Sequence, residues 1–427
     1  MLNDIGGIPF PDHLWNGPQI IGWFFLFSCL VIVSVSFAAK CIKIFAIKFK
    51  ISPTFIGGVV LSTFTSLPEF FTSIYAGVSD RLTNLPEKTL FSFFNITGAN
   101  AVQIFILSIF GFSLFLIYFK NKEQFRSKLD RIKQSVVFLP FKTISNYYYS
   151  SISSKTSETT NELINKNQKL NQFYLSNWNP IIQVNFILWL ITLIEYLLIL
   201  LFLLVPSWGE VFSVNGFSFI NFLFFLSWLT YSIYTYKFNP ESEDLYSPSL
   251  TKTWAWKINP YFLIFFIIFF SASLAFFAYL NSGIVNRSEV IGIPKSAAAS
   301  FFLSIATSLP EITLFITLCR KRLFATAGAS ILGSSVFNLS IPFYSNLISF
   351  NPLYGNNFAK LLNDPSIDNQ DAKRLIPWMG FSIILYVLLA TSASRPSCKR
   401  SWLSTNLIFL MMIGYIVGFV LISKLIN

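Results

Sequence analysis

Residues 61–69 read LSTFTSLPE and residues 303–311 read LSIATSLPE, so one phrase occurs twice with seven of its nine positions identical. Both copies lie inside long apolar stretches, and each ends on a glutamate that follows a proline, Glu69 and Glu311. A charged side chain at the centre of a bilayer costs about 3 kcal/mol on insertion scales. Two such glutamates in a repeated setting therefore indicate a functional centre inside a membrane.

The composition is that of a membrane protein. Of the 427 residues, 54% are hydrophobic and 12% are charged, and the mean hydropathy is +0.60, values outside the range of an ordinary soluble domain. His13 is the single histidine and the four cysteines are scattered. We therefore expect no zinc site, disulfide framework, histidine-based catalysis or haem. No Lys or Arg precedes the first apolar run, so no cleavable signal peptide is expected.

Ten stretches reach the length of roughly 20 mostly apolar residues that a membrane helix needs. They cover residues 20–39, 53–78, 91–119, 181–205, 217–236, 259–280, 294–318, 325–348, 376–394 and 402–423. An even number of spans places both termini on the same side of the membrane.

The basic residues support this arrangement because they divide unequally between the two sides. Of the 31 Lys and Arg residues, 23 fall on the side of the loops that follow odd-numbered spans. This asymmetry predicts that the basic side is cytoplasmic and that both termini lie outside, in a plasma or inner membrane. The net charge of +12 is thus mainly a topology signal. We expect membrane lipids and transported cations as partners, no nucleic acid, and no obligate protein partner.

The two copies of the phrase lie in spans 2 and 7, which run in opposite directions because five spans separate them. The fold class predicted is an all-α polytopic membrane protein with ten transmembrane helices in two inverted five-helix repeats. The halves would be residues 1–236 and 237–427, with the repeated blocks at 53–119 and 294–348. The basic segment 120–180 would be a cytoplasmic loop. Its first part is either a basic amphipathic helix or part of a disordered linker.

The helix after each phrase also repeats. Span 3 carries NITGANAVQ at residues 95–103, and span 8 carries SILGSSVFN at residues 330–338. Each has a glycine, Gly98 or Gly333, followed five residues later by an amide side chain. The glycines would let spans 3 and 8 approach spans 2 and 7 closely, and the amides could add oxygen ligands.

Hydroxyl groups share a helix face with each glutamate, because residues i, i+3, i+4 and i+7 lie on one side of a helix. The two stripes are Ser62, Thr65, Ser66 and Glu69, and Ser304, Thr307, Ser308 and Glu311. A hydroxyl stripe alone is typical of a packing face, and an isolated glutamate can be protonated and structural. Duplication of a stripe that ends on a carboxylate favours a set of ion ligands. Pro68 and Pro310 would add the released carbonyls of Phe64 and Ala306.

These candidate ligands are all hard oxygens, which favour Na⁺ or Ca²⁺ over zinc, copper or iron. Two carboxylates balance one Ca²⁺ or two monovalent ions, so the two kinds of cation would compete for one site. That competition is what an exchanger needs. No cofactor is expected, and the transported ions would be Ca²⁺ together with Na⁺ or H⁺.

The two phrases and their glycine-bearing helices resemble the α-repeats of the cation/Ca²⁺ exchanger superfamily, in particular the Na⁺/Ca²⁺ exchanger branch with its bacterial members. The resemblance implies ion ligands at Thr65, Ser66, Glu69, Gln103, Thr307, Ser308, Glu311, Ser334 and Asn338. Three positions depart from the family pattern. Ala99 stands where the family usually has Ser, Gln103 is longer than the usual Asn or Asp, and Asn338 stands where many members have Asp, so a third acid is missing.

The function predicted is secondary active antiport of Ca²⁺ for Na⁺, by alternating access around a midplane site between spans 2, 3, 7 and 8. The protein would not be an enzyme. An H⁺-coupled Ca²⁺/cation exchanger is the alternative, and an intramembrane hydrolase or a transport-inactive homologue are remote alternatives. Glu195 in span 4 is a further acid within the membrane, either a relay for ion passage or a structural or interfacial residue.

Overall fold

A computed structural model of the chain describes residues 17–49, 55–83, 86–133, 186–237, 259–285, 296, 298–320, 324–353, 356–363, 370–393, 409–418 and 420. These residues are almost entirely helical. The first half contains α1 (Gly17–Lys48), the π-helical turn η2 (Ile56–Leu61), α3 (Ser62–Thr65), α4 (Leu67–Thr83), α5 (Glu87–Lys133), α8 (Phe186–Leu204), α9 (Pro206–Val211) and α10 (Phe219–Lys237). The second contains α12 (Pro260–Val285), the π-helical turn η7 (Ala298–Leu303), α14 (Ser304–Arg320), α15 (Phe324–Ser349), α16 (Asn356–Asn363) and α17 (Gln370–Ala393). A short apolar helix, Phe409–Gly418, follows.

Within the described residues, five helices are long and apolar enough to cross a membrane. They lie at Pro18–Ile42, Glu87–Phe110, Ile187–Leu204, Ala298–Cys319 and Ala372–Leu389. Shorter apolar helices cover Ile56–Thr65, Pro260–Leu274 and Phe409–Gly418. Every predicted span overlaps a described helix, while the count of ten crossings and their inverted order stay predictions.

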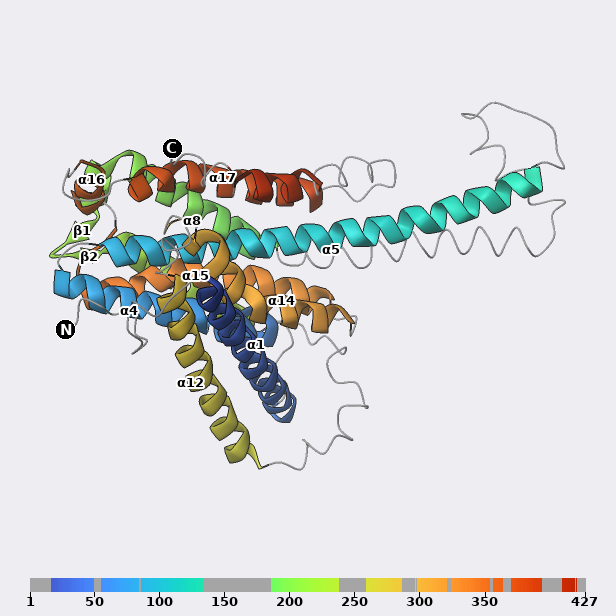
Figure 1. Ribbon diagram of the computed structural model, residues 1–427, viewed down its shortest axis with the longest axis horizontal. Helices are drawn as coiled ribbons and strands as arrows, with labels where there is room; N and C mark the ends of the chain where they lie inside the picture. The colour runs from blue at the N-terminus through green and yellow to red at the C-terminus, as the bar shows by residue number, and fades with distance from the viewer. Residues whose placement is uncertain are drawn as a thin grey trace.

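Two groups of helices are visible in Figure 1. Helices α1 and α12 lie side by side and cross the others steeply, whereas α4, α5, α14, α15 and α17 run roughly along the long axis of the molecule. The α1–α12 pair is held by stacked Phe37 and Phe270 rings, 5.3 Å between centroids. Asn281 Nδ2 also donates to Ser28 Oγ at 3.3 Å. The pair therefore forms a unit of its own beside the site.

Helix α5 continues well past the predicted membrane span and projects beyond the rest of the molecule (Figure 1). The first part of segment 120–180 is therefore helical up to Lys133, where α5 ends, as one of the two predicted alternatives has it. The physical reason is that residues 120–133 contain no Gly or Pro to stop the helix and are rich in good helix formers. The rest of the predicted loop, 134–180, lies outside the described residues.

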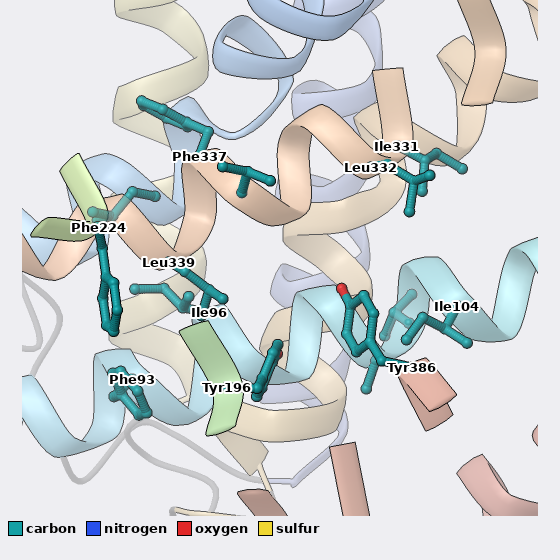
Figure 2. Close-up of a cluster of buried hydrophobic side chains, with 14 of the residues drawn as sticks. Phe93, Ile96, Ile104, Tyr196, Phe224, Ile331, Leu332, Phe337, Leu339 and Tyr386 are labelled. Atoms are coloured by element: carbon teal, nitrogen blue, oxygen red, sulfur yellow. The ribbon is translucent and has the colours of Figure 1, made fainter. Parts of the chain in front are cut away.

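The apolar core surrounds α5 and α15. Figure 2 shows Phe93, Ile96 and Ile104 of α5 with Ile331, Leu332, Phe337 and Leu339 of α15, and with Tyr196 of α8, Phe224 of α10 and Tyr386 of α17. Helix α17 is also tied to α5 by a hydrogen bond from Trp378 Nε1 to Thr97 Oγ1 at 2.9 Å. In contrast, α12 exposes large apolar side chains such as Phe262, Phe265 and Phe269, a surface suited to lipid.

One small sheet departs from the all-α prediction. Strands β1 (Ser213–Val214) and β2 (Phe217–Ser218) pair antiparallel, joined by Asn215 (φ 50°) and Gly216 (φ 81°). Asn-Gly favours this two-residue turn because both positions need positive φ. Asn346 of α15 donates to the carbonyl of Gly216 and accepts from the amide of Ser218, both at 2.8 Å, so the hairpin fixes the end of α15.

Candidate functional site

The backbone before each repeated phrase widens into a π-helical turn, η2 before Ser62 and η7 before Ser304. The two turns occupy corresponding positions, since residue 56 relates to 298 as Glu69 relates to Glu311. Such turns occur frequently at functional sites. The copies then differ: the first helix is interrupted at Ser66 (φ −90°, ψ 9°), whereas α14 continues through Pro310.

Gly98 and Gly333 bring the halves together, as predicted from their small size. A Cβ at Gly98 would lie 2.3 Å from the Ser300 carbonyl oxygen, and one at Gly333 would lie 2.2 Å from the Gly58 carbonyl oxygen. Gly58 and Ser300 are themselves corresponding positions in the two π-helical turns. Each glycine-bearing helix therefore touches the phrase-bearing segment of the opposite half, and only glycine fits at either contact.

The nine predicted site residues all lie in the interior, each at most 1% exposed. They come from four places: the first phrase (Thr65, Ser66, Glu69), α5 (Gln103), α14 (Thr307, Ser308, Glu311) and α15 (Ser334, Asn338). Burial of so many polar groups is costly unless they are bonded. Their contacts therefore show how the site is organised.

Glu311 is the centre of a hydrogen-bonded cluster. Its Oε1 accepts from Ser66 Oγ at 3.2 Å and from Ser334 Oγ at 3.1 Å. The two serine hydroxyls also contact each other at 2.5 Å. Gln103 Nε2 donates to Ser334 Oγ at 3.0 Å. Ser66 and Ser334 thus meet α14 at a single carboxylate oxygen, and Gln103 joins the cluster through Ser334.

The two amides of the predicted ligand set are oriented by neighbouring polar residues. Gln103 Oε1 accepts from Ser335 Oγ at 2.7 Å, so its nitrogen, not its oxygen, faces Ser334. Asn338 Nδ2 donates to Asn100 Oδ1 at 2.9 Å, which leaves Asn338 Oδ1 without a hydrogen-bond partner. In this arrangement Asn338 has a free amide oxygen and Gln103 does not.

The two threonines bond mainly to backbone and to one asparagine. Thr65 Oγ1 donates within its own turn, to Leu61 O at 2.9 Å and Ser62 O at 3.1 Å. Thr307 Oγ1 lies 3.4 Å from Asn95 Oδ1. Both hydroxyl oxygens keep lone pairs that a cation could use.

Glu69 is surrounded differently from Glu311. Both of its carboxylate oxygens are buried and without a hydrogen-bond partner in the described part of the chain. The Thr307 hydroxyl lies nearby without closing a hydrogen bond, and the Glu311 carboxylate is close enough to interact electrostatically. Glu311 Oε2 and the Ser308 hydroxyl also have no hydrogen-bond partner among the described residues. These buried oxygens need a cation or protons to satisfy them.

Carboxylate, hydroxyl and amide oxygens are the ligand types that Na⁺ and Ca²⁺ accept. Among the residues that the structure describes, no three His, Cys, Asp or Glu side chains gather into one group. A site with two carboxylates and several neutral oxygens suits a hard cation held as cargo.

Sequence reasoning missed the residues that orient this site, Asn95, Asn100 and Ser335. Asn95 accepts from Ser304 and Thr307, and Asn100 Nδ2 donates to the Ser335 carbonyl at 3.2 Å. A signal was present in the repeat. Aligning Gly98 with Gly333 pairs Asn95 with Ser330 and Asn100 with Ser335, so both positions are polar in both copies.

The family described as "Sodium/calcium exchanger protein" matches residues 19–237, slightly more than half of the chain. The chain therefore belongs to the sodium/calcium exchanger family, within the cation/Ca²⁺ exchanger superfamily. It is a multi-pass integral membrane protein of a family made up of transporters, which act by antiport of cations including calcium. No curated protein sequence matches the chain.

Two kinds of solved structure are similar to the chain. The sodium-calcium exchanger NCX_Mj, soaked with Na⁺ and Ca²⁺, has a TM-score of 0.47 and 16% identity, covering 94% of this chain and 98% of that one. The H⁺/Ca²⁺ exchanger CAX has a TM-score of 0.49 and 13% identity, covering 95% of this chain and 92% of that one.

Proposed function

We propose that this protein is a secondary active antiporter that exchanges Ca²⁺ for Na⁺ at the site built around Glu69 and Glu311. One observation carries the proposal: two carboxylates from opposite halves are wholly buried, and three of their four oxygens have no hydrogen-bond partner among the residues that the structure describes. A buried carboxylate without a partner is costly, and a bound cation removes that cost. One Ca²⁺ or two Na⁺ would balance the same two charges, so the ions exclude each other.

The ligands in this proposal are Glu69 and Glu311 with the hydroxyls of Thr65, Ser66, Thr307, Ser308 and Ser334 and the amides of Asn338 and Gln103. Gln103 would need to rotate its amide so that the oxygen faces the cation, because in this structure that oxygen accepts a hydrogen bond from Ser335. Alternating access would come from the α1–α12 pair moving against the helices that carry the site. Helix α1 packs against α14 and α12 packs against α4, so the pair contacts both helices that carry the glutamates.

The proposed topology is ten spans in two inverted halves, residues 1–236 and 237–427, with both termini outside and the basic loops in the cytoplasm of a plasma or inner membrane. The distribution of Lys and Arg supports it. Membrane lipids would cover the exposed apolar faces of α1 and α12. No obligate protein partner is proposed.

Coupling to H⁺ instead of Na⁺ is the second candidate. The amides Gln103 and Asn338 are neutral, so the site has two acids. Na⁺, which must compete with Ca²⁺, then has fewer anionic ligands, and this favours coupling to H⁺. Protons could neutralise the two glutamates directly. A hydrolase is not pursued, because the family consists of transporters.

The test is ⁴⁵Ca²⁺ uptake into proteoliposomes, driven separately by a Na⁺ gradient and by a pH gradient. Uptake driven by Na⁺ supports the proposal, and uptake driven by pH and indifferent to Na⁺ selects the second candidate. Glu69→Gln and Glu311→Gln should each lower uptake about 100-fold, because losing one partner of a buried charge contact costs about 3 kcal/mol. Glu210→Gln, at an exposed carboxylate of α9, should transport as the wild type does.

Wild-type rates in both Gln variants would refute the site. Absence of uptake in the wild-type protein under both gradients, together with no cation binding in calorimetry, would identify a transport-inactive homologue.

A further inference from the structure

Glu195 is a buried carboxylate outside the cation site. It lies on α8 and is 2% exposed. Its Oε1 is hydrogen-bonded to Ser227 Oγ of α10. Its Oε2 is buried without a hydrogen-bond partner among the described residues. A charged carboxylate with one donor would be expensive here.

The contacts of Ser227 indicate where a proton resides. Ser227 Oγ contacts both Glu195 Oε1 and the Phe224 carbonyl, the latter at 2.8 Å. A serine hydroxyl has one proton to donate, and neither a carbonyl nor an ionised carboxylate can donate in return. Both contacts are satisfied together only when Glu195 is protonated. The acid then donates to Ser227, and Ser227 donates to Phe224.

The groups that face Glu195 contain no positive charge in the described part of the chain. Helix α17, which packs against α8, presents Tyr386, and Tyr196 follows Glu195 on α8 itself. Both tyrosines interact electrostatically with Glu195. On α17, Arg374 bonds to Ser296 and Lys373 is exposed. The remaining carboxylate nearby, Glu210 of α9, is also exposed. A proton is therefore the cation available to neutralise Glu195.

The same two tyrosines lead toward the cation site. Their rings lie 5.2 Å apart, and Trp189 Nε1 holds the Tyr386 carbonyl at 2.8 Å. The Tyr196 hydroxyl approaches Asn100 and the Tyr386 hydroxyl approaches Ser335, without closing a hydrogen bond. Figure 2 shows the Tyr386 hydroxyl directed toward the region between α5 and α15. Asn100 and Ser335 are the residues that orient Asn338 and Gln103.

We propose that Glu195 and Ser227 form a proton-binding site, separate from the cation site, which acts on it through Tyr196 and Tyr386. When Glu195 is protonated, the tyrosine hydroxyls remain beside Asn100 and Ser335. When Glu195 loses its proton to water, the new negative charge attracts the hydroxyl protons of both tyrosines away from them. Asn338 and Gln103 then change orientation, and cation binding changes with them. Protonation of Glu195 thus regulates transport without entering the ligand set.

The first experiment detects the proton itself and does not depend on transport. An infrared difference spectrum between wild type and Glu195→Gln at neutral pH should show loss of one carbonyl band of a protonated carboxylic acid. Gln suits this comparison because its NH₂ can donate to Ser227 as the protonated acid does. The control Glu210→Gln removes an exposed carboxylate and should remove no such band. Absence of a lost acid band in Glu195→Gln would overturn the proposal even if the protein transports Ca²⁺.

The second experiment measures the coupling. Across the pH range in which Glu195 titrates, the apparent Ca²⁺ affinity of the wild type should change by about fivefold, the lower end of usual coupling between two sites. Glu195→Gln should bind Ca²⁺ with no such step, and Tyr386→Phe should reduce the step while leaving the acid band in place. A step of wild-type size in Glu195→Gln would refute the coupling. If Glu195→Gln does not fold, Ser227→Ala serves instead, and an acid band at the wild-type frequency would count against the site.

Discussion

The two halves of the protein carry nearly the same nine residues, yet their glutamates have unlike surroundings. Glu311 accepts from Ser66 and Ser334, while both oxygens of Glu69 lack a hydrogen-bond partner in the described structure. The backbones differ too, since the first phrase is interrupted at Ser66 and the second is continuous. A repeat in sequence therefore does not make the two carboxylates equivalent.

The difference arises at the positions that correspond to the donors of Glu311. Ser334 corresponds to Ala99, which is buried and has no hydroxyl. Ser66 corresponds to Ser308, whose hydroxyl is unpartnered. If the halves were symmetric, Glu69 would accept from both. The missing hydroxyl at Ala99 removes one of these donors, and in the described structure Ser308 does not supply the other. Glu69 is therefore the glutamate with more to gain from a cation.

The largest effect should come from exchanging each glutamate for glutamine in the absence of Ca²⁺ and Na⁺. Glu69→Gln should stabilise the cation-free protein by about 1–3 kcal/mol, because it removes an unpartnered buried acid. Glu311→Gln should not stabilise it, because Ser66 and Ser334 lose their acceptor or must rearrange. Thermal unfolding in detergent measures both. Equal shifts in the two variants would contradict the proposed inequality.

The two halves agree in their glycine contacts. The same substitution in either half should therefore lower stability by a similar amount. Gly98→Ala and Gly333→Ala each force a Cβ against a backbone carbonyl, and overpacking of this kind costs about 1–3 kcal/mol. Gly22→Ala on α1 meets no atom within 4 Å and should be neutral or slightly stabilising. Unfolding measurements on the three variants check this, and tolerance of either site variant would show that the halves do not pack as described.

Serine substitutions in the two halves should also change stability unequally, but by a smaller amount. Ser334→Ala removes a donor to Glu311 and an acceptor for Gln103, so the cation-free protein should lose about 1–2 kcal/mol. Ser308→Ala removes a hydroxyl that makes no hydrogen bond, and should change stability by less than about 0.5 kcal/mol. Both should weaken Ca²⁺ binding in calorimetry if both hydroxyls are ligands. Equal stability losses would count against the asymmetry.

The smallest effect is expected from a substitution that gives position 99 the same side chain as its counterpart, Ser334. Ala99→Ser gives α5 the hydroxyl that Ser334 supplies on α15, and its oxygen, as an added cation ligand, should raise Ca²⁺ affinity about threefold, an energy within the usual range of one hydrogen bond. Ala101→Ser is the matched control, because residues two apart on a helix do not share a face. Calorimetric titration distinguishes them. A gain in the control, or a loss in Ala99→Ser, would show that a hydroxyl at position 99 does not act as a cation ligand.

The sequence by itself determined the parts of this protein that depend on local patterns. The apolar runs predict its helices, the repeated phrase predicts its site, and Gly98 and Gly333 predict close packing, because periodicity, charge and side-chain size act over a few turns of helix. The Asn215–Gly216 hairpin could have been predicted as well, since that pair requires no distant partner. For the start of segment 120–180 the sequence left a helix and a linker open, and the structure shows a helix up to Lys133.

Only the tertiary structure decided which groups in the site have partners. The hydrogen bonds that distinguish Glu311 from Glu69 join residues such as Ser66 and Ser334, or Gln103 and Ser334, which are 268 and 231 positions apart. The orientation of the Gln103 amide and the contact between Glu195 and Ser227 depend equally on other helices. A side chain's hydrogen-bond partners are fixed by packing between segments, so no local pattern contains them.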